Sequence, residues 1–131
     1  MAAAGLLAAC GDDDTGGDDG AASLPQGGEA YDLDPADLTA QIDHDLWPME
    51  PGTRWRYREV DEDGEELEVL ITVSTETREI ANGVTARVVR DTVTQDGDVV
   101  EDTFDWYAQD ADGNVWYLGE DTAELEDGEI T

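Results

Sequence analysis

From Arg54 onward, β-branched and aromatic residues alternate with polar ones, which is the period-two pattern of half-buried β-strands. Glycine-containing turn sequences interrupt this pattern at regular intervals. They are Asp61-Glu62-Asp63-Gly64, Asn82-Gly83, Thr94-Gln95-Asp96-Gly97, Asp110-Ala111-Asp112-Gly113 and Leu125-Glu126-Asp127-Gly128. This pattern predicts an all-β fold, with an antiparallel meander of about five strands forming one layer of a sandwich or open barrel.

The turn types predict the strand registers. Four of the turns share the form x-x-Asp-Gly, which favours a type I turn with a left-handed glycine, whereas Asn82-Gly83 favours a two-residue type I′ hairpin. The registers also predict two cross-strand ion pairs, Arg87 with Asp105 and Arg90 with Asp102. The residues expected to lie opposite each other are Trp55 and Ile71, Tyr57 and Val69, Val73 and Thr92, Thr77 and Val88, Val88 and Phe104, Ala86 and Trp106, Trp106 and Leu118, Ala108 and Trp116, and Tyr107 and Tyr117.

These registers predict a sheet with a single apolar face. That face would carry Trp55, Tyr57, Leu67, Val69, Ile71, Val73, Ala86, Val88, Val100, Phe104, Trp106, Ala108, Trp116 and Leu118. The reverse face would carry Arg54, Arg56, Arg58, Val89, Val93, Tyr107 and Tyr117. Because such a face needs a cover, we expect a second layer to pack against it.

A short amphipathic helix is expected ahead of the first strand. Asp34 is a typical N-cap, Pro35 suits the first helical position, and Leu38, Ile42 and Leu46 recur at every fourth residue. The helix would end before Trp47-Pro48 and is too small to cover the predicted apolar face alone.

Charge and composition limit the classes of partner that the chain is expected to bind. The chain has 35 acidic residues, six arginines and a formal net charge of −29, which repels phosphate backbones and excludes nucleic acid as a partner. The same charge attracts cations. Residues 11–28 are rich in aspartate and glycine and nearly devoid of aliphatic residues, so they are expected to form a flexible acidic tether.

The start of the chain contains the only cysteine, directly behind a short apolar run. The sequence Leu7-Ala8-Ala9-Cys10 resembles the lipobox of bacterial lipoproteins. This resemblance implies that Cys10 carries a lipid, becomes the mature N-terminus and anchors the protein to the extracytoplasmic face of the cell membrane. No positive charge precedes the run Ala2 to Ala9, so it is interpreted as a truncated signal peptide.

We therefore expect three regions: a truncated signal peptide at residues 1–9, a lipidated cysteine and flexible Asp/Gly linker at 10–30, and a β-rich domain at 31–131. Glu126-Asp127-Gly128 predicts a further hairpin, but three residues follow it. The domain is expected to be incomplete at its C-terminus, with the missing part supplying the second layer.

Two aromatic segments, Trp47–Tyr57 and Asp105–Glu120, resemble an uncharacterised family of secreted proteins and lipoproteins from actinobacteria and related bacteria. The likeness spans roughly residue 42 to the end. The resemblance implies an exported protein that continues beyond this point, and it assigns no catalytic or binding residue.

Metal-binding motifs are weak. Asp110, Asp112 and Asn114 echo the start of an EF-hand loop, but the glycine comes at the fourth position instead of the sixth. A hairpin turn is the preferred interpretation, and calcium at these three residues is the alternative. The single histidine, His44, lies between two aspartates and is interpreted as a solvated side chain.

Tyr107 and Tyr117 are the candidate ligand-binding residues, because they are expected to be paired outside the core, where they could stack on a sugar ring. The sequence has no serine-nucleophile elbow, phosphate loop or Cys-x-x-Cys pair, so neither an enzyme nor a cofactor is expected. The sequence favours a lipid-anchored extracytoplasmic binding or structural module for an envelope ligand or cations. The alternatives are a hydrolase with its active site mostly in a missing C-terminal part, and a calcium-stabilised domain.

Overall fold

The protein is an open antiparallel sheet in which each strand pairs with the next one along the chain. The computed structural model describes residue 28 and residues 33–131. The strands are β1 (Arg54–Val60), β2 (Glu66–Glu79), β3 (Thr85–Gln95), β4 (Asp98–Gln109), β5 (Val115–Glu126) and β6 (Glu129–Ile130). Two short 3-10 turns accompany them, η1 (Pro35–Asp37) and η2 (Ala81–Gly83).

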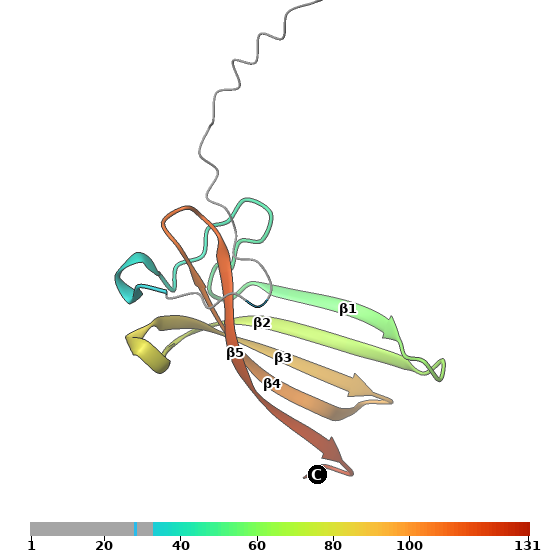
Figure 1. Ribbon diagram of the computed structural model, residues 1–131. Coiled ribbons are helices and arrows are strands. Elements are labelled where there is room, and N and C mark those ends of the chain that lie inside the picture. The colour runs from blue at the N-terminus through green and yellow to red at the C-terminus, as the bar shows by residue number, and fades with distance from the viewer. Residues whose placement is uncertain (1–27, 29–32) are drawn as a thin grey trace, which may run out of the picture.

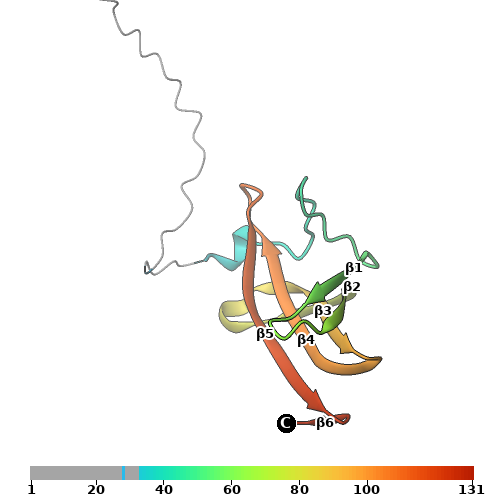
Figure 2. The same ribbon diagram turned by 90° about the vertical axis from the view of Figure 1, so that its right-hand side faces the viewer.

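The sheet is strongly twisted, so that β5 runs steeply across the direction of β1, β2 and β3 (Figure 1, Figure 2). β1 forms one edge, and β6 pairs with only the last two residues of β5 at the other. The predicted all-β meander of about five strands is confirmed, with β6 as a short sixth strand. Within the described residues, no helix has the length and apolar character needed to cross a membrane.

Two of the predicted turns form as expected. In each, the first aspartate donates its backbone N–H to the residue after the glycine, from Asp61 to Glu65 at 3.0 Å and from Asp110 to Asn114 at 2.9 Å. The glycines Gly64 and Gly113 take positive φ angles of 87° and 90°. The predicted β1–β2 register follows, with Trp55 opposite Ile71 and Tyr57 opposite Val69.

Two other Asp-Gly turns are shorter than predicted. At Asp96-Gly97 and at Asp127-Gly128 both residues take positive φ, which makes two-residue type I′ hairpins instead of type I turns with a bulge. Val100 is an extra residue that forms a bulge in β4. Because of it, the side chains of β3 and β4 share sides of the sheet as predicted, but Val88 lies opposite Trp106 and not opposite Phe104.

The predicted single apolar face is wrong because the Asn82-Gly83 loop is one residue longer than a type I′ turn. Ile80 donates to the carbonyl of Val84, leaving three residues in the loop. Together with the bulge in β2 between Val73 and Thr77, which shifts the register by two more residues, this loop places Val73 opposite Val89 and not opposite Thr92. A shift of one residue exchanges the two sides of a strand, so the β3–β5 half of the sheet is turned over relative to the expectation.

The sheet therefore carries apolar side chains on both sides. One side, which we call the tyrosine face, carries Trp55, Tyr57, Ile71, Val73, Val89, Asp91, Asp105, Tyr107 and Tyr117. The other side, which we call the arginine face, carries Arg54, Arg56, Arg58, Arg78, Val88, Arg90, Phe104 and Trp106.

The segment ahead of β1 covers one end of the tyrosine face instead of forming the predicted helix. Asp34 caps a single 3-10 turn, after which Thr39 pairs with Gln109 in an isolated β-bridge. Ile42 and Met49 then pack with Val73 and Val89 in the small buried core. The helix prediction fails because pairing with β4 satisfies the backbone of this segment in an extended form.

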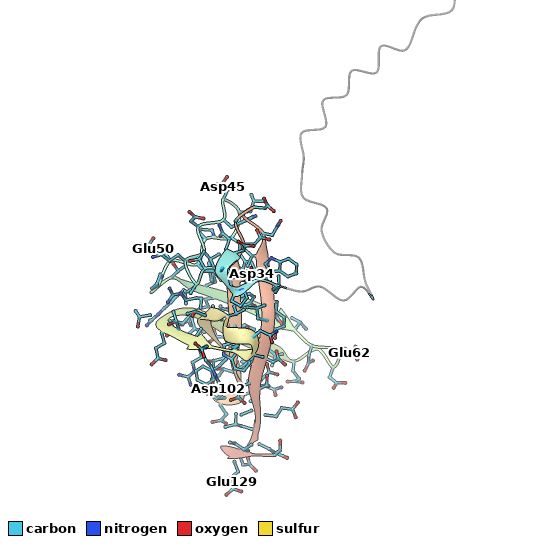
Figure 3. The ribbon with its side chains drawn as sticks, turned by 60° about the vertical axis from the view of Figure 1, so that its left-hand side comes forward. Asp34, Asp45, Glu50, Glu62, Asp102 and Glu129 are labelled. Carbon is cyan, nitrogen blue, oxygen red and sulfur yellow. The ribbon has the colours of Figure 1, made fainter. Side chains whose placement is uncertain are left out.

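The covering segment lies at the end of the sheet opposite the β5–β6 hairpin. Figure 3 shows Asp45 and Glu50 of this segment at one end of the molecule and Glu129 at the other. The covered core lies at one end of the tyrosine face, while Tyr57, farther along the same face, is 47% exposed.

Arg87 joins the covering segment to an irregularity in β2. Between Val73 and Thr77, three residues of β2 oppose one residue of β3. The buried Arg87 guanidinium donates to the carbonyls of Ser74 and Glu76 at 3.3 and 3.2 Å and to that of Ala40 at 3.1 Å. The predicted Arg87–Asp105 ion pair is therefore wrong, because Arg87 bonds carbonyls that the bulge leaves outside the ladder.

Candidate functional site: the tyrosine face

Three aromatic rings meet where the covering segment crosses β4 and β5. Tyr107 and Tyr117 lie opposite each other, as predicted, with ring centroids 5.3 Å apart. Trp47 packs edge-on against Tyr107 with a centroid distance of 5.2 Å. Trp47 and Tyr117 remain 41% and 53% exposed, so the cluster presents aromatic surface to solvent.

Two carboxylates surround the hydroxyl of Tyr117. It lies 2.6 Å from Oε2 of Glu120 and 3.2 Å from Oδ1 of Asp105, to either of which it can donate. The hydrogen bond to Glu120 raises the pKa of Tyr117, and burial raises the pKa of Asp105. Burial and the charge of Asp105 also raise the pKa of Tyr107 to about 12, so both phenols keep their proton at physiological pH.

Asp91 adds a third carboxylate on the neighbouring strand. It lies on β3 opposite Thr103, which is two residues before Asp105 on β4. Its Oδ1 atom is buried without a hydrogen-bond partner in the described structure. Burial, reinforced by the charges of Asp105 and Glu101, raises the pKa of Asp91 to about 6. This part of the sheet is therefore a site of concentrated negative charge.

The charge of Asp91 is expected to destabilise the folded protein above pH 6. The pKa of Asp91 is higher in the folded chain than in the unfolded chain, so the protonated carboxyl favours the folded state. This contribution to the free energy of unfolding is fully present below about pH 4 and is lost as pH rises through about 6. Asp91→Asn should raise the free energy of unfolding by about 1 kcal/mol at about pH 7.5 and change it little at about pH 4, since solvent screens a partly exposed carboxylate.

The measurement is urea unfolding at the two pH values. Asp121→Asn is the matched control, because Asp121 is exposed on the arginine face and the same net charge is removed. Equal effects of the two substitutions at both pH values would contradict the account.

The rings and carboxylates together are suited to an organic cation. Aromatic faces attract ammonium groups, and adjacent carboxylates add direct charge pairing. No group of three or more acidic, histidine or cysteine side chains in the described part of the chain is arranged to hold a metal ion.

Asp110, one of the three calcium candidates, organises its own hairpin. Its Oδ1 accepts from the backbone N–H groups of Asp112 and Asn114, and its Oδ2 accepts from the Asn114 amide and from Trp116 Nε1 at 2.8 Å. Burial would raise the pKa of Asp110, but these hydrogen bonds lower it overall. The predicted hairpin turn accounts for the aspartate, while calcium binding there stays a prediction.

Removing the Asp110 side chain should weaken the hairpin. We expect Asp110→Ala to lower the free energy of unfolding by about 2 kcal/mol, because several donors lose one carboxylate. Asp112→Ala is the control, since the Asp112 carboxylate accepts no hydrogen bond in the described structure.

In thermal melts, millimolar calcium should stabilise the protein no more than sodium does at matched ionic strength. A calcium-specific increase would support the calcium-stabilised alternative.

The arginine face has a different chemistry. Trp106 lies against Gly119, where an added Cβ would come within 3.4 Å of the indole ring, and the Arg78 guanidinium lies 4.6 Å from the indole centroid. Arg90 lies over Phe104 at 5.6 Å. A hollow of about 450 Å³ lies beside these rings. As predicted, Arg90 pairs with Asp102, and both hydrogen bonds are 2.7 Å long.

Comparison with known proteins assigns neither fold relatives nor a family: no family model, curated protein or solved structure matches this chain. The resemblance to an actinobacterial family therefore stays a prediction. Cys10 and residues 11–27 of the expected acidic tether lie outside the described residues.

The structure unites the two sequence-predicted tyrosines but adds partners that sequence reasoning missed. The sequence places Trp47 directly after the expected helix and predicts Asp105 as the partner of Arg87, and it does not single out Asp91 or Glu120 among the many other acidic residues. The sequence signal for Asp91 is its position, because strand alternation places it between Val89 and Val93 on one side of β3. A carboxylate flanked in this way by apolar residues is unusual.

Proposed function

We propose that this chain is a lipid-anchored extracytoplasmic binding module whose tyrosine face binds an ammonium-bearing ligand of the cell envelope. The observation that carries the proposal is the exposed aromatic cluster of Trp47, Tyr107 and Tyr117 beside Asp105 and Glu120. The lipobox resemblance at Cys10 supports the location, and the net charge of −29 favours cationic ligands.

The chemistry suits an amino sugar. One face of a sugar ring can stack on the exposed rings of Trp47 and Tyr117, while an ammonium group pairs with Glu120 or Asp105. The hydrolase alternative, with its active site mostly in a missing C-terminal part, stays a prediction.

A pair of matched oligosaccharides tests the ligand class. Calorimetry with glucosamine oligomers and N-acetylglucosamine oligomers compares the same ring with and without an ammonium group. We expect the cationic oligomer to bind at least about tenfold more tightly. Equal affinity would reduce the site to sugar stacking, and absence of binding to both would remove the proposed ligand class.

Variants locate the binding surface. Tyr117→Ala and Trp47→Ala should each weaken binding of the glucosamine oligomer about fivefold. Tyr57→Ala is the control, because Tyr57 is an exposed tyrosine of the same face on β1. An equal loss in the control would contradict the assignment to the aromatic cluster.

The anchor is tested separately with Cys10→Ser. In a bacterial host that expresses the full gene, the unchanged protein should incorporate labelled fatty acid and sediment with membranes, whereas Cys10→Ser should do neither. Incorporation of fatty acid by Cys10→Ser would exclude this cysteine as the lipid attachment site.

A further inference from the structure

The open edge of β1 offers a regular row of backbone hydrogen-bonding groups. Asp61 N donates to Glu65 O, and Val73 N donates to Thr53 O. Because hydrogen-bonded pairs alternate along an antiparallel ladder, the odd-numbered residues of β1 bond to β2. Arg54, Arg56 and Arg58 therefore direct their N–H and C=O groups toward the open edge.

The same three residues direct their side chains to the arginine face. All three are exposed, and the closest carboxylate contact among them is an Arg56–Glu68 pair at 3.7 Å, in which both side chains are more than half exposed. Such a pair contributes little stability and is readily exchanged for another carboxylate. Neither Arg54 nor Arg58 forms an ion pair within 4.0 Å in the described structure.

We propose that the β1 edge binds an acidic, extended segment of a partner protein by strand addition. The incoming backbone pairs with the outward N–H and C=O groups of the even-numbered β1 residues, which are Arg54, Arg56, Arg58 and Val60. Residues directly opposite one another in an antiparallel pair share a face, so carboxylates at every second position of the added strand meet the three guanidinium groups.

The positive charge of β1 favours an acidic partner segment over a second copy of this chain paired through β1. Two β1 strands paired about a twofold axis would place arginines across from arginines, which is repulsive. The strand carries three arginines and one glutamate in a chain with a formal charge of −29, so it is the most cationic of the described strands. At physiological ionic strength the charges of the remaining chain are screened beyond about 8 Å.

Synthetic peptides test the spacing. The first has glutamates alternating with threonine and valine, the second has the same composition with its glutamates in one block, and the third has lysines in place of the glutamates. With the full chain in about 0.15 M salt, we expect the alternating peptide to bind at least about tenfold more tightly than the block peptide, and no binding of the lysine peptide.

Variants separate the edge from general charge attraction. Combined Arg54→Gln, Arg56→Gln and Arg58→Gln should abolish binding of the alternating peptide. Val60→Pro removes an outward N–H without changing charge and should weaken binding about fivefold, while the β1–β2 ladder stays intact. Combined Arg78→Gln and Arg90→Gln, on the same face but away from the edge, should leave affinity unchanged.

Amide hydrogen exchange provides the direct readout. In the free protein the amides of Arg56 and Arg58 should exchange faster than those of Trp55 and Tyr57, and the peptide should protect them. Equal binding of the alternating and block peptides, an equal loss in the Arg78/Arg90 control, or a β1-mediated dimer in the absence of peptide would overturn the proposal.

Discussion

Arg87→Met is expected to lower the free energy of unfolding by about 3 kcal/mol, one of the two largest single-residue effects in this protein. The Arg87 side chain is only 7% exposed, and its guanidinium donates to three carbonyls from the covering segment and the β2 bulge. Methionine fills similar space but leaves these carbonyls without their donor. For a domain of this size the melting temperature should fall by roughly 15 °C.

Arg54→Met is the matched control, because Arg54 is exposed on β1. Its effect should stay within about 0.5 kcal/mol. If Arg87→Met melted within a few degrees of the unchanged protein, Arg87 would not be the link between the covering segment and the bulge.

Met49→Ala should lower the free energy of unfolding by about 3 kcal/mol, because it opens a cavity in a core that contains few other large side chains. Met49 is 1% exposed and packs with Ile42, Val73 and Val89. Leu46→Ala is a control of similar size in the same segment, since Leu46 is 90% exposed. Urea unfolding compares them, and similar losses for the two variants would contradict the observed packing of this segment.

Much of the strand pairing could be predicted from the sequence, because several turns leave little freedom. At Asp61 and Asp110 the aspartate side chain accepts backbone N–H groups of its own turn, which stabilises the four-residue form. The β1–β2 register and the pairing of Tyr107 with Tyr117 were therefore predicted correctly.

The side of the sheet on which each β3–β5 side chain lies, relative to β1 and β2, could not be predicted. The reason is that the dipeptide Asn82-Gly83 is compatible with loops of different length. Asn82-Gly83 takes positive φ at both residues, as a type I′ turn requires, yet sits in a three-residue loop. A single added residue then exchanged the two sides of β3 relative to β2. The β2 bulge shifts the register by two residues and so leaves the faces unchanged.

The candidate site was half predicted for a related reason. Tyr107 and Tyr117 belong to one hairpin, so a local register sufficed to place them together. Trp47 reaches them only because Thr39 pairs with Gln109 and Asp43 bonds the Gln109 side chain, contacts that span about 70 residues of sequence. Local patterns of polarity do not contain this information.

The two-faced sheet is the central claim, since the β2–β3 register places Tyr107 and Tyr117 on the same side of the sheet as Trp55. Measurement of interstrand Hα–Hα nuclear Overhauser effects tests it most directly. The structure predicts a strong contact between Val73 and Val89 and another between Val69 and Val93. A contact between Val73 and Thr92 in their place would restore the one-sided sheet and contradict the account.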